Sequence, residues 1–403
     1  MQKLHDLPMP ASPLTIFLIF LRLGLTSFGG PIAHLAYFRN EFVTRRRWFG
    51  EAGYADLVAL CQFLPGPASS QVGFAIGLVR GGYAGALAAW IAFTLPSAML
   101  MVAFAWAAAS LEGPVAQGAL HGLKLVAVAI VAQAVWGMAK SLTPDWPRRA
   151  IALAAIAIVL AAGGAIGQIT AIFAGAAAGL ALASGDPAPA EAEKQRSAAL
   201  PAALLALAVI LLFALPLLAA TGAGGRGLAL FEAFYRAGAL VFGGGHVVLP
   251  LLEQSVVANG WVTQDAFLAG YGVAQAMPGP LFTVAAYLGA ASMPAAAGLP
   301  GAIIALVAIF LPGLLLVAGM LPFWHHMRRF RLMRGAMAGI NAAVVGILAA
   351  ALYDPLWTSA ILSPLDLVLA LAGFAALVWL RMPPLTIVAA LAVASALAAM
   401  LAG

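Results

Sequence analysis

Charged residues are scarce in this chain of 403 residues. Asp, Glu, Lys and Arg make up 8% of the sequence, whereas soluble domains carry about 25%. Hydrophobic residues make up 64%, and they gather in long runs that reach the roughly 20 residues of a membrane-spanning helix. A soluble fold has no way to bury this much apolar surface. We therefore predict an all-α polytopic protein whose surroundings are the lipid bilayer.

Cysteine and the sequence motifs of common enzymes are also nearly absent. Cys61 is the only cysteine, so the chain can form no internal disulfide and no cysteine-based metal site. The sequence contains no HExxH, P-loop, GxSxG or CxxC pattern. We therefore expect no enzyme activity, no metal and no cofactor. The net charge of +6 indicates arginine-rich cytoplasmic loops rather than a nucleic-acid surface.

What the sequence does contain is a motif that occurs twice. RLGLTSFGG at 22–30 and RAGALVFGGGH at 236–246 each place an arginine six residues before Phe-Gly-Gly. Further pairs follow in the same order along both halves. They include Gln62 with Gln275, Pro65-Gly66-Pro67 with Pro278-Gly279-Pro280, and Lys124 with Asn341. We predict an N-terminal repeat over 1–183, a cytoplasmic linker and connecting transmembrane helix over 184–220, and a C-terminal repeat over 221–403.

Basic residues are distributed unequally between corresponding loops of the two halves. Three arginines occupy 45–47, whereas the matching loop 254–264 has none. Four arginines lie within 328–334, and the matching loop 109–117 again has none. Because cytoplasmic loops collect Lys and Arg, this pattern predicts two halves that cross the membrane in opposite directions. The fold class that we expect is an inverted-topology repeat with broken-helix hairpins, whether re-entrant or fully spanning.

Glycine and proline interrupt each predicted hairpin near its middle. Proline removes a backbone donor, and glycine tolerates conformations that other residues avoid. Non-helical backbone at membrane depth is stable only where protein or water satisfies its polar groups. The breaks therefore predict one central polar transport site. They lie at Gly29-Gly30-Pro31, Pro65-Gly66-Pro67, Gly243-Gly244-Gly245 and Pro278-Gly279-Pro280.

Arg22 and Arg236 are the charged candidates for this site. An arginine remains protonated inside a membrane, and its planar fork matches the oxygens of an oxyanion two at a time. Helix N-termini that follow the breaks would add free N–H donors and a positive dipole end. The alternative is that each arginine reaches the membrane surface or pairs with Glu41, Glu232 or Glu253.

Several polar residues flank the breaks and complete the candidate set. Gln62, Gln275, Ser69, Ser70 and Thr283 can donate hydrogen bonds to an oxyanion, or else satisfy backbone freed by the prolines. Histidine titrates near neutrality, so a histidine beside a break can couple a proton or simply bond a carbonyl. The candidates for coupling are His34, Glu253 and Lys124, and His246 is counted with the binding residues.

Four segments resemble the chromate ion transporter family, whose long-chain members carry two homologous domains. They are FLRLGLTSFGGPIAH at 20–34, FLPGPASSQVGFAIG at 63–77, FYRAGALVFGGGHVVLPLLE at 234–253 and AMPGPLFTVAAYLGA at 276–290. The resemblance covers about 13–400. It implies a protein of the bacterial inner membrane that exports chromate, confers chromate resistance, uses the membrane potential or a proton gradient, and is inhibited by sulfate.

The residues alone indicate only that the cargo is an oxyanion, so other functions stay open. The cargo could be sulfate, molybdate or another oxyanion, and the direction could be uptake. An anion channel or a membrane-embedded enzyme is a further alternative. A homodimer is compatible with this architecture, and no nucleic-acid partner is expected.

Overall fold

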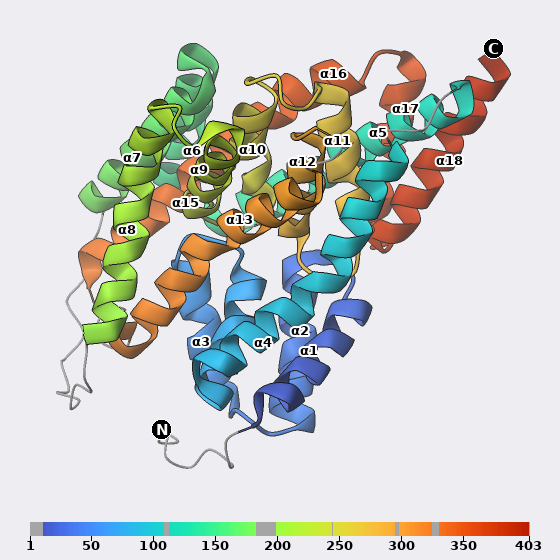
Figure 1. Cartoon of the computed structure of the whole chain (residues 1–403). Coiled ribbons are helices and arrows are strands. Elements are labelled where there is room, and N and C mark those ends of the chain that lie inside the picture. Colours follow the sequence, from blue (N-terminus) through green and yellow to red (C-terminus); the bar gives the residue numbers. More distant parts are fainter. Residues whose placement is uncertain are drawn as a thin grey trace. The chain divides into compact units, whose positions relative to one another are not determined.

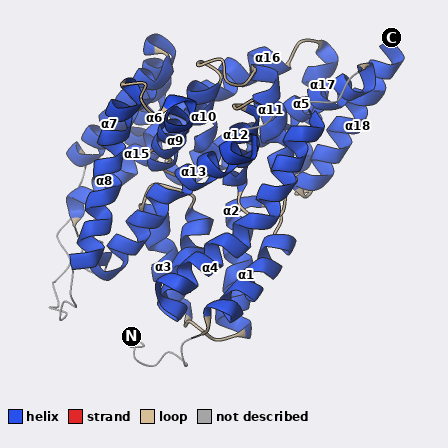
Figure 2. Ribbon diagram, viewed as in Figure 1, coloured by secondary structure: helices blue, strands red, loops and turns tan. Residues whose placement is uncertain are grey.

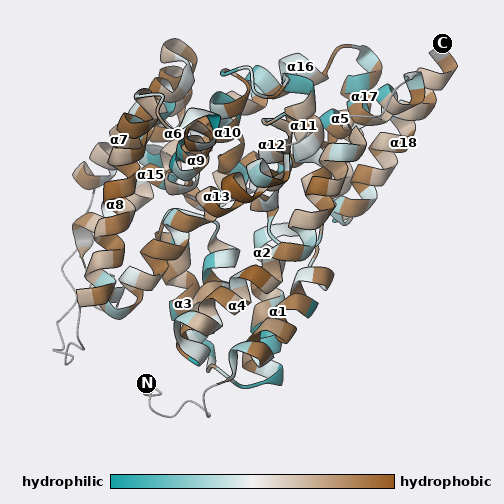
Figure 3. Ribbon diagram, in the orientation of Figure 1, coloured by the Kyte–Doolittle hydropathy of each residue, from teal (hydrophilic) through white to brown (hydrophobic). Residues whose placement is uncertain are grey.

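The computed structural model describes residues 11–108, 113–182, 199–243, 245–294, 298–324 and 330–402. Within these ranges the regular structure is helical, and no strand occurs (Figure 2). Seven helices in the described part of the chain are long and apolar enough to cross a membrane. Hydrophobic residues occur along the length of almost every helix (Figure 3). The prediction of an all-α polytopic membrane protein is therefore confirmed.

The chain divides into two compact units, and each unit contains segments from both sequence halves. Unit 1 comprises Met1–Ala103, Lys194–Gly245 and Met277–Trp324. Unit 2 comprises Phe104–Glu193, His246–Ala276 and His325–Gly403. The repeat boundaries that we expect from the sequence, at 183 and 221, stay a prediction.

The first part of unit 1 contains two pairs of helices, and a break separates the two helices of each pair. Ser12 caps the first helix by accepting a hydrogen bond from the backbone N–H of Thr15. Helix α4 is kinked at Gly81 and Gly82, which have non-helical dihedral angles. This kink divides α4 into two helical segments. The elements are α1 (Pro13–Thr26), α2 (Gly30–Arg39), η2 (Asn40–Arg45), α3 (Glu51–Phe63) and α4 (Ala68–Ala108).

The second part of unit 1 is organised around α13, which lies beside α8, α9 and α12 (Figure 1). Most side chains of α8 are exposed, as expected for a helix that faces lipid. The elements are α8 (Ala199–Ala220), α9 (Gly225–Ala239), η4 (Leu281–Thr283), α12 (Val284–Ala291), α13 (Gly298–Met320) and η6 (Leu321–Phe323).

An aromatic cluster joins α1, α2, η2 and α4 in unit 1. Phe38 is fully buried, and its ring centroid lies 5.6 Å from that of Phe20 and 5.1 Å from that of Phe93. Phe42 stacks on Trp48 at 5.1 Å. These rings bury large apolar areas in edge-to-face and stacked arrangements, so they hold the first break against α4.

The arginine-rich loop after α2 contains its own counter-charge. Glu41 accepts hydrogen bonds from Arg45 at 3.0 Å and from Arg46 at 2.5 Å. Burial opposes ionisation of Glu41, but these two guanidinium groups outweigh it and hold the pKa of the carboxyl below its usual value. Glu41 is therefore engaged within its own loop rather than with Arg22.

Unit 2 is built on two long helices, α5 and α15. Helices α17 and α18 from the second half pack on α5, and α6 and α7 from the first half pack on α15. The elements are α5 (Pro114–Leu142), α6 (Trp146–Ala162), α7 (Gly164–Ala181), α10 (Val248–Val256), α11 (Gln264–Ala274), α15 (Arg331–Ala351), η7 (Leu352–Trp357), α16 (Thr358–Ala360), α17 (Pro364–Val378) and α18 (Pro384–Ala402). The short η3 (Gly245–Val247) starts in unit 1 and ends in unit 2.

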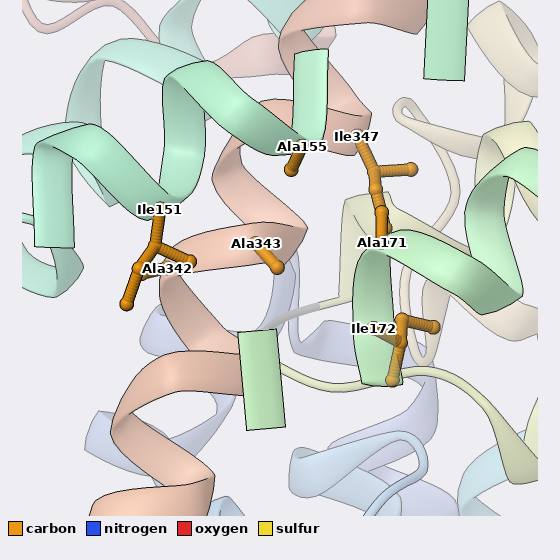
Figure 4. Close-up of a cluster of buried hydrophobic side chains, with 7 residues drawn as sticks. All are labelled: Ile151, Ala155, Ala171, Ile172, Ala342, Ala343 and Ile347. Atoms are coloured by element: carbon orange, nitrogen blue, oxygen red, sulfur yellow. The ribbon is translucent and has the colours of Figure 1, made fainter. Parts of the chain in front are cut away.

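Glycines allow these helices to approach closely. A Cβ atom on Gly122 of α5 would lie 2.4 Å from the carbonyl oxygen of Leu391 in α18. A Cβ atom on Gly339 of α15 would lie 2.0 Å from the carbonyl oxygen of Gly175 in α7. Gly122 and Gly339 are counterparts in the repeat, so equivalent glycines make equivalent close contacts, as in other membrane helix pairs. Figure 4 shows the apolar side chains that pack between α6, α7 and α15.

The predicted helix breaks are confirmed, but Gly30, Pro31 and Gly245 lie in the helical elements that follow the breaks. Helix α1 ends at Thr26 and α2 begins at Gly30, so Pro31 lies in the first turn of α2 instead of in the break. Proline suits this position because its missing N–H has no partner there. The other breaks fall between α3 and α4, between α9 and η3, and between α11 and η4. Gly244, Arg328, Arg329 and the predicted linker up to residue 198 lie outside the described residues.

Candidate functional site

The Pro-Gly-Pro turn of each half is hydrogen-bonded to the glycine break of the other half. In unit 1, the Gly66 N–H donates to the Val241 carbonyl at 2.7 Å, and the Gly279 N–H donates to the Ser27 carbonyl at 2.8 Å. Ser27 and Val241 occupy equivalent positions, immediately before Phe-Gly-Gly. Each break therefore satisfies backbone groups of the other, which is what non-helical backbone inside a membrane requires.

Both turns depend on glycine at their centre. Gly66 has φ of +125° and Gly279 has φ of +94°, which side chains with a Cβ rarely adopt. A Cβ atom on Gly66 would also lie 2.9 Å from Nε2 of Gln71. On Gly279 it would lie 3.0 Å from Oγ of Ser97. The turns are thus packed against polar groups of α4.

Equivalent glycines allow α1 and α9, the two helices that precede the glycine breaks, to pack closely on α4 and α13. A Cβ atom on Gly24 of α1 would lie 2.8 Å from the carbonyl oxygen of Phe93 in α4. On Gly238 of α9 it would lie 2.1 Å from the carbonyl oxygen of Ile309 in α13. Phe93 and Ile309 occupy matching positions, two residues before the paired Leu-Pro. The same contact is therefore made once in each half.

His34 is fully buried beside the first break and connects it to α4. Its Nε2 lies 3.2 Å from the Ser27 carbonyl, and its Nδ1 lies 3.3 Å from Oγ of Ser69. The imidazole also forms a T-shaped pair with the ring of Phe93. The Ser27 carbonyl thus accepts from both His34 and Gly279.

Gln71 satisfies backbone that the second break frees. Its Nε2 donates to the carbonyls of Pro65 at 2.9 Å and of Gly313 at 3.2 Å. Thr283 likewise donates to the Pro280 carbonyl at 2.8 Å. For Thr283 the structural role that we considered as an alternative is therefore present in the geometry, and Gln71 has the same kind of role.

Other buried polar atoms near the breaks have no such partner. They lie on Ser27 (Oγ), Ser70 (Oγ), Gln71 (Oε1) and Thr94 (Oγ1), and none of them hydrogen-bonds within the part of the chain that the structure describes. Buried polar atoms are nearly always hydrogen-bonded, so unpartnered hydroxyls indicate a ligand or water. Ser27 and Thr94 are candidates that the sequence analysis missed. Both lie directly before a repeated motif, and this position in the sequence could have identified them.

The two repeated arginines have different surroundings. Arg22 is exposed on α1, and its guanidinium makes no hydrogen bond or ion pair with another described residue. Arg236 is partly exposed on α9 and pairs with Glu232 at 2.6 Å. Gln62 is exposed near the end of α3. Among the described residues, no hydrogen bond or ion pair therefore joins Arg22 and Arg236 to each other or to the buried hydroxyls.

The remaining candidates belong to unit 2. Nδ1 of His246 lies 2.7 Å from the hydroxyl of the buried Tyr271, which the sequence analysis did not single out. Gln275 ends α11, and Glu253 is half-buried on α10. Lys124 of α5 donates to Asp265 of α11 at 2.8 Å, so its charge is paired across 141 residues of sequence. In the described residues, no group of three His, Cys, Asp or Glu side chains is arranged to hold a metal ion.

Comparison with known proteins agrees with this architecture. The sequence profile of the Chromate transporter family matches residues 14–180 and again 228–397. A probable chromate transport protein of Synechococcus elongatus is 31% identical over 82% of this chain and 81% of its own length. The chromate transport protein of Pseudomonas aeruginosa is 30% identical over 86% and 82%, and that of Cupriavidus metallidurans is 28% identical over 83% and 80%. No solved structure matches the chain. The chain therefore belongs to the chromate transporter family, as a long member with two homologous domains.

Proposed function

We propose that this protein is a secondary transporter that exports chromate, a tetrahedral oxyanion, across the bacterial inner membrane and thereby confers chromate resistance. Membership of the chromate transporter family supports the cargo, and the helices long enough to cross a membrane support the location. Relatives of about 30% identity carry the name chromate transport protein. Direction, energy coupling and resistance are part of the proposal.

The observation that carries the proposal is the group of unpartnered hydroxyls at the interlocked breaks of unit 1. Ser27 and Ser70 each hold a buried oxygen without a partner among the described residues. A hydroxyl donates one hydrogen bond and suits an oxyanion oxygen. Helix α2 starts at this place, and no side chain caps its first N–H groups. These N–H groups and the positive end of the helix dipole favour an anion.

The positive charges in the proposal are Arg22 and Arg236. Arg22 is free to attract an anion toward the break, because no described side chain neutralises it. Arg236 would first exchange the carboxylate of Glu232 for the oxyanion. We propose a supporting role for the other candidates: Gly29, Gly30, Gly66, Gly243, Gly244, Gly279 and the flanking prolines shape the breaks, His246 is counted with the binding residues, and His34, Lys124 and Glu253 take part in coupling.

Cellular chromate accumulation tests the proposal. Cells that express Arg22→Ala or Arg236→Ala should accumulate more chromate than cells with the wild-type protein, because the anion loses a charged partner. Arg148→Ala is the matched control, since Arg148 is a partly exposed arginine at the start of α6 in unit 2, where it pairs with Asp145. Unchanged accumulation with both variants present in the membrane would exclude these arginines from the site.

A second cargo class is sulfate or another oxyanion, with uptake as the alternative direction. Nothing in the described site separates oxyanions of similar size and charge. Uptake of labelled chromate into proteoliposomes, with sulfate or molybdate as competitors, distinguishes the cargoes. Counterflow of chromate would be expected of a transporter and not of an anion channel.

We also propose that the two repeats have opposite membrane orientations. The unequal arginine content of matching loops supports this orientation. The reciprocal hydrogen bonds of the two breaks and the exchanged helix pairs of unit 2 are what a two-fold relation between the halves would produce. Both halves would then contribute to one transport path.

A further inference from the structure

We infer that His34 is a proton-operated switch that decides whether the Ser69 hydroxyl can donate to the oxyanion. This inference rests on the proposed function and assigns a regulatory role within that site. His34 is a positioning residue here, because it acts on the anion through Ser69. The argument uses the geometry of three groups in unit 1: His34, Ser69 and the Ser27 carbonyl.

The partners of His34 determine which of its nitrogens carries the proton. A carbonyl oxygen can only accept, so the contact of Nε2 with the Ser27 carbonyl at 3.2 Å requires a hydrogen on Nε2. In the neutral ring Nδ1 is then an acceptor. Ser69 must turn its single hydroxyl hydrogen toward Nδ1, across 3.3 Å. With neutral His34, Ser69 therefore has only lone pairs left for any ligand, and lone pairs repel an anion.

Protonation of His34 reverses this bond. Nδ1 then carries a hydrogen and donates to the lone pair of Ser69, while Nε2 continues to donate to Ser27. The hydroxyl hydrogen of Ser69 is released and can point at an oxyanion. The ring gains one positive charge at the same time. A single proton thus adds both a donor and a charge that favour anion binding.

Among the described residues, no charged side chain is hydrogen-bonded to His34. The elements packed around it carry Arg22 on α1, Arg39 on α2 and Arg80 on α4. None of these arginines has a hydrogen bond to His34, and Arg39 pairs with Glu51 instead. The hydrogen-bond partners of His34 among the described residues are Ser69 and the Ser27 carbonyl, and its ring pairs with that of Phe93. A protonated His34 therefore lacks a carboxylate partner, and a bound oxyanion would supply the missing negative charge.

The same carbonyl connects the switch to the second half of the chain. The Ser27 oxygen also accepts the Gly279 N–H at 2.8 Å. Protonation strengthens the His34 bond to this oxygen, because a charged donor binds more strongly than a neutral one. The state of His34 is thus sensed at the Pro-Gly-Pro turn of the other repeat.

Proton and oxyanion binding must then favour each other, since coupling between two sites is reciprocal. The oxyanion should bind more tightly as the pH falls through the range in which His34 titrates. The test is equilibrium binding of chromate to the purified protein at about pH 8 and about pH 4, a range that extends below the ordinary titration of histidine because His34 is fully buried. We expect the affinity of the wild type to rise by about fivefold or more between these values, as typical coupling gives.

Variants separate His34 from the acid–base chemistry of chromate, which is common to every protein compared. His34→Gln keeps a donor and an acceptor without a titratable charge and should lose most of the pH dependence. Ser69→Ala should bind less tightly at low pH, and Ser69→Thr should restore binding. His121→Gln is the matched histidine control, because His121 pairs with Asp366 in unit 2. Its pH profile should equal that of the wild type.

Each outcome bears on one proposal or the other. The switch is wrong if folded His34→Gln keeps the pH dependence of the wild type. Should His34→Gln fail to fold, Ser69→Ala decides: an unchanged affinity ratio between the two pH values overturns the switch, and a reduced ratio that Ser69→Thr restores supports it. Wild-type protein that binds no oxyanion at either pH would instead contradict the proposed function.

Discussion

Ser70 is an example of a buried polar residue whose proposed role is to bind a ligand and not to support the fold. Its hydroxyl oxygen is buried and has no partner in the described part of the chain. The side-chain amide of the neighbouring Gln71 instead donates to the backbone carbonyls of Pro65 and Gly313. A hydroxyl that stabilises nothing in the folded chain but lies beside a helix break is placed to serve a ligand.

We predict that Ser70→Ala lowers chromate transport by about tenfold while the thermal stability stays unchanged or rises slightly. The variant removes an unsatisfied buried group, which costs no hydrogen bond in the free protein, but it removes a donor to a charged ligand. Initial transport rates in proteoliposomes and the unfolding midpoint in detergent measure the two effects.

Ser141→Ala is the control for this prediction, because Ser141 is exposed on α5 and bonds the Gly137 carbonyl. Its transport should equal that of the wild type. If Ser70→Ala unfolds the protein or leaves transport intact, Ser70 has no role in binding.

The repeated arginines illustrate what the sequence reveals at the scale of a residue. Glu232 precedes Arg236 by four residues, so their ion pair follows from helix spacing, and it is among the alternatives that the sequence suggests. Lys124 and Asp265 are far apart in sequence, and only packing of α11 on α5 brings them together. Local spacing predicts the first pair but carries no information about the second.

At the scale of elements, the aromatic cluster of unit 1 holds the first broken hairpin in place. Phe20 comes from α1, Phe38 from α2 and Phe93 from α4, and each is almost fully buried. His34 lies one turn before Phe38 on the same helix and touches the ring of Phe93. The position of the proposed switch therefore depends on this packing.

We predict that Phe38→Ala lowers the free energy of unfolding by about 3–5 kcal/mol, the usual cost of removing a buried aromatic ring. Tyr37→Ala, at a neighbouring position that is 43% exposed, should change it by less than about 0.5 kcal/mol. Unfolding of the purified protein by added denaturing detergent measures both. Equal losses would show that the cluster does not stabilise the hairpin.

At the scale of the molecule, the two halves exchange elements instead of folding side by side. Both units contain segments of both halves. In unit 2, the last helices of each half pack on the long helix of the other, α5 or α15. Such exchange makes separate expression of one half unfavourable, because each half would expose the glycine-lined faces that the other covers.

The orientation of the repeats makes a prediction about the whole chain. Cysteines introduced as Thr44→Cys and Ala258→Cys lie at exposed positions in matching loops of the two halves. In a Cys61→Ala background, an impermeant maleimide should label Ala258→Cys in intact cells but Thr44→Cys only after permeabilisation. The parent variant without added cysteines gives the background, since Cys61 is the only native cysteine. Labelling of both positions from the same side would exclude an inverted repeat.

Much of the architecture was predictable from local chemistry. Apolar length determines which segments become helices, and glycine with proline determines where α1, α3, α9 and α11 end. The repeated motifs also identified Gly66 and Gly279 as central to the breaks. One detail differed at the first break: Gly30 and Pro31 form the start of α2 instead of lying in the break, because a first-turn proline loses no hydrogen bond.

The sequence by itself thus determined the helices, their interruptions and the duplication, since these follow from residues close together in the chain. Only the tertiary structure decided that Gly279 bonds Ser27, that Gly66 bonds Val241, and that His34 meets Ser69. The physical reason is that these bonds join groups distant in sequence. The residues around a backbone N–H or a hydroxyl do not indicate which group it will bond in the folded chain. Burial requires that each such group find one, and packing selects which.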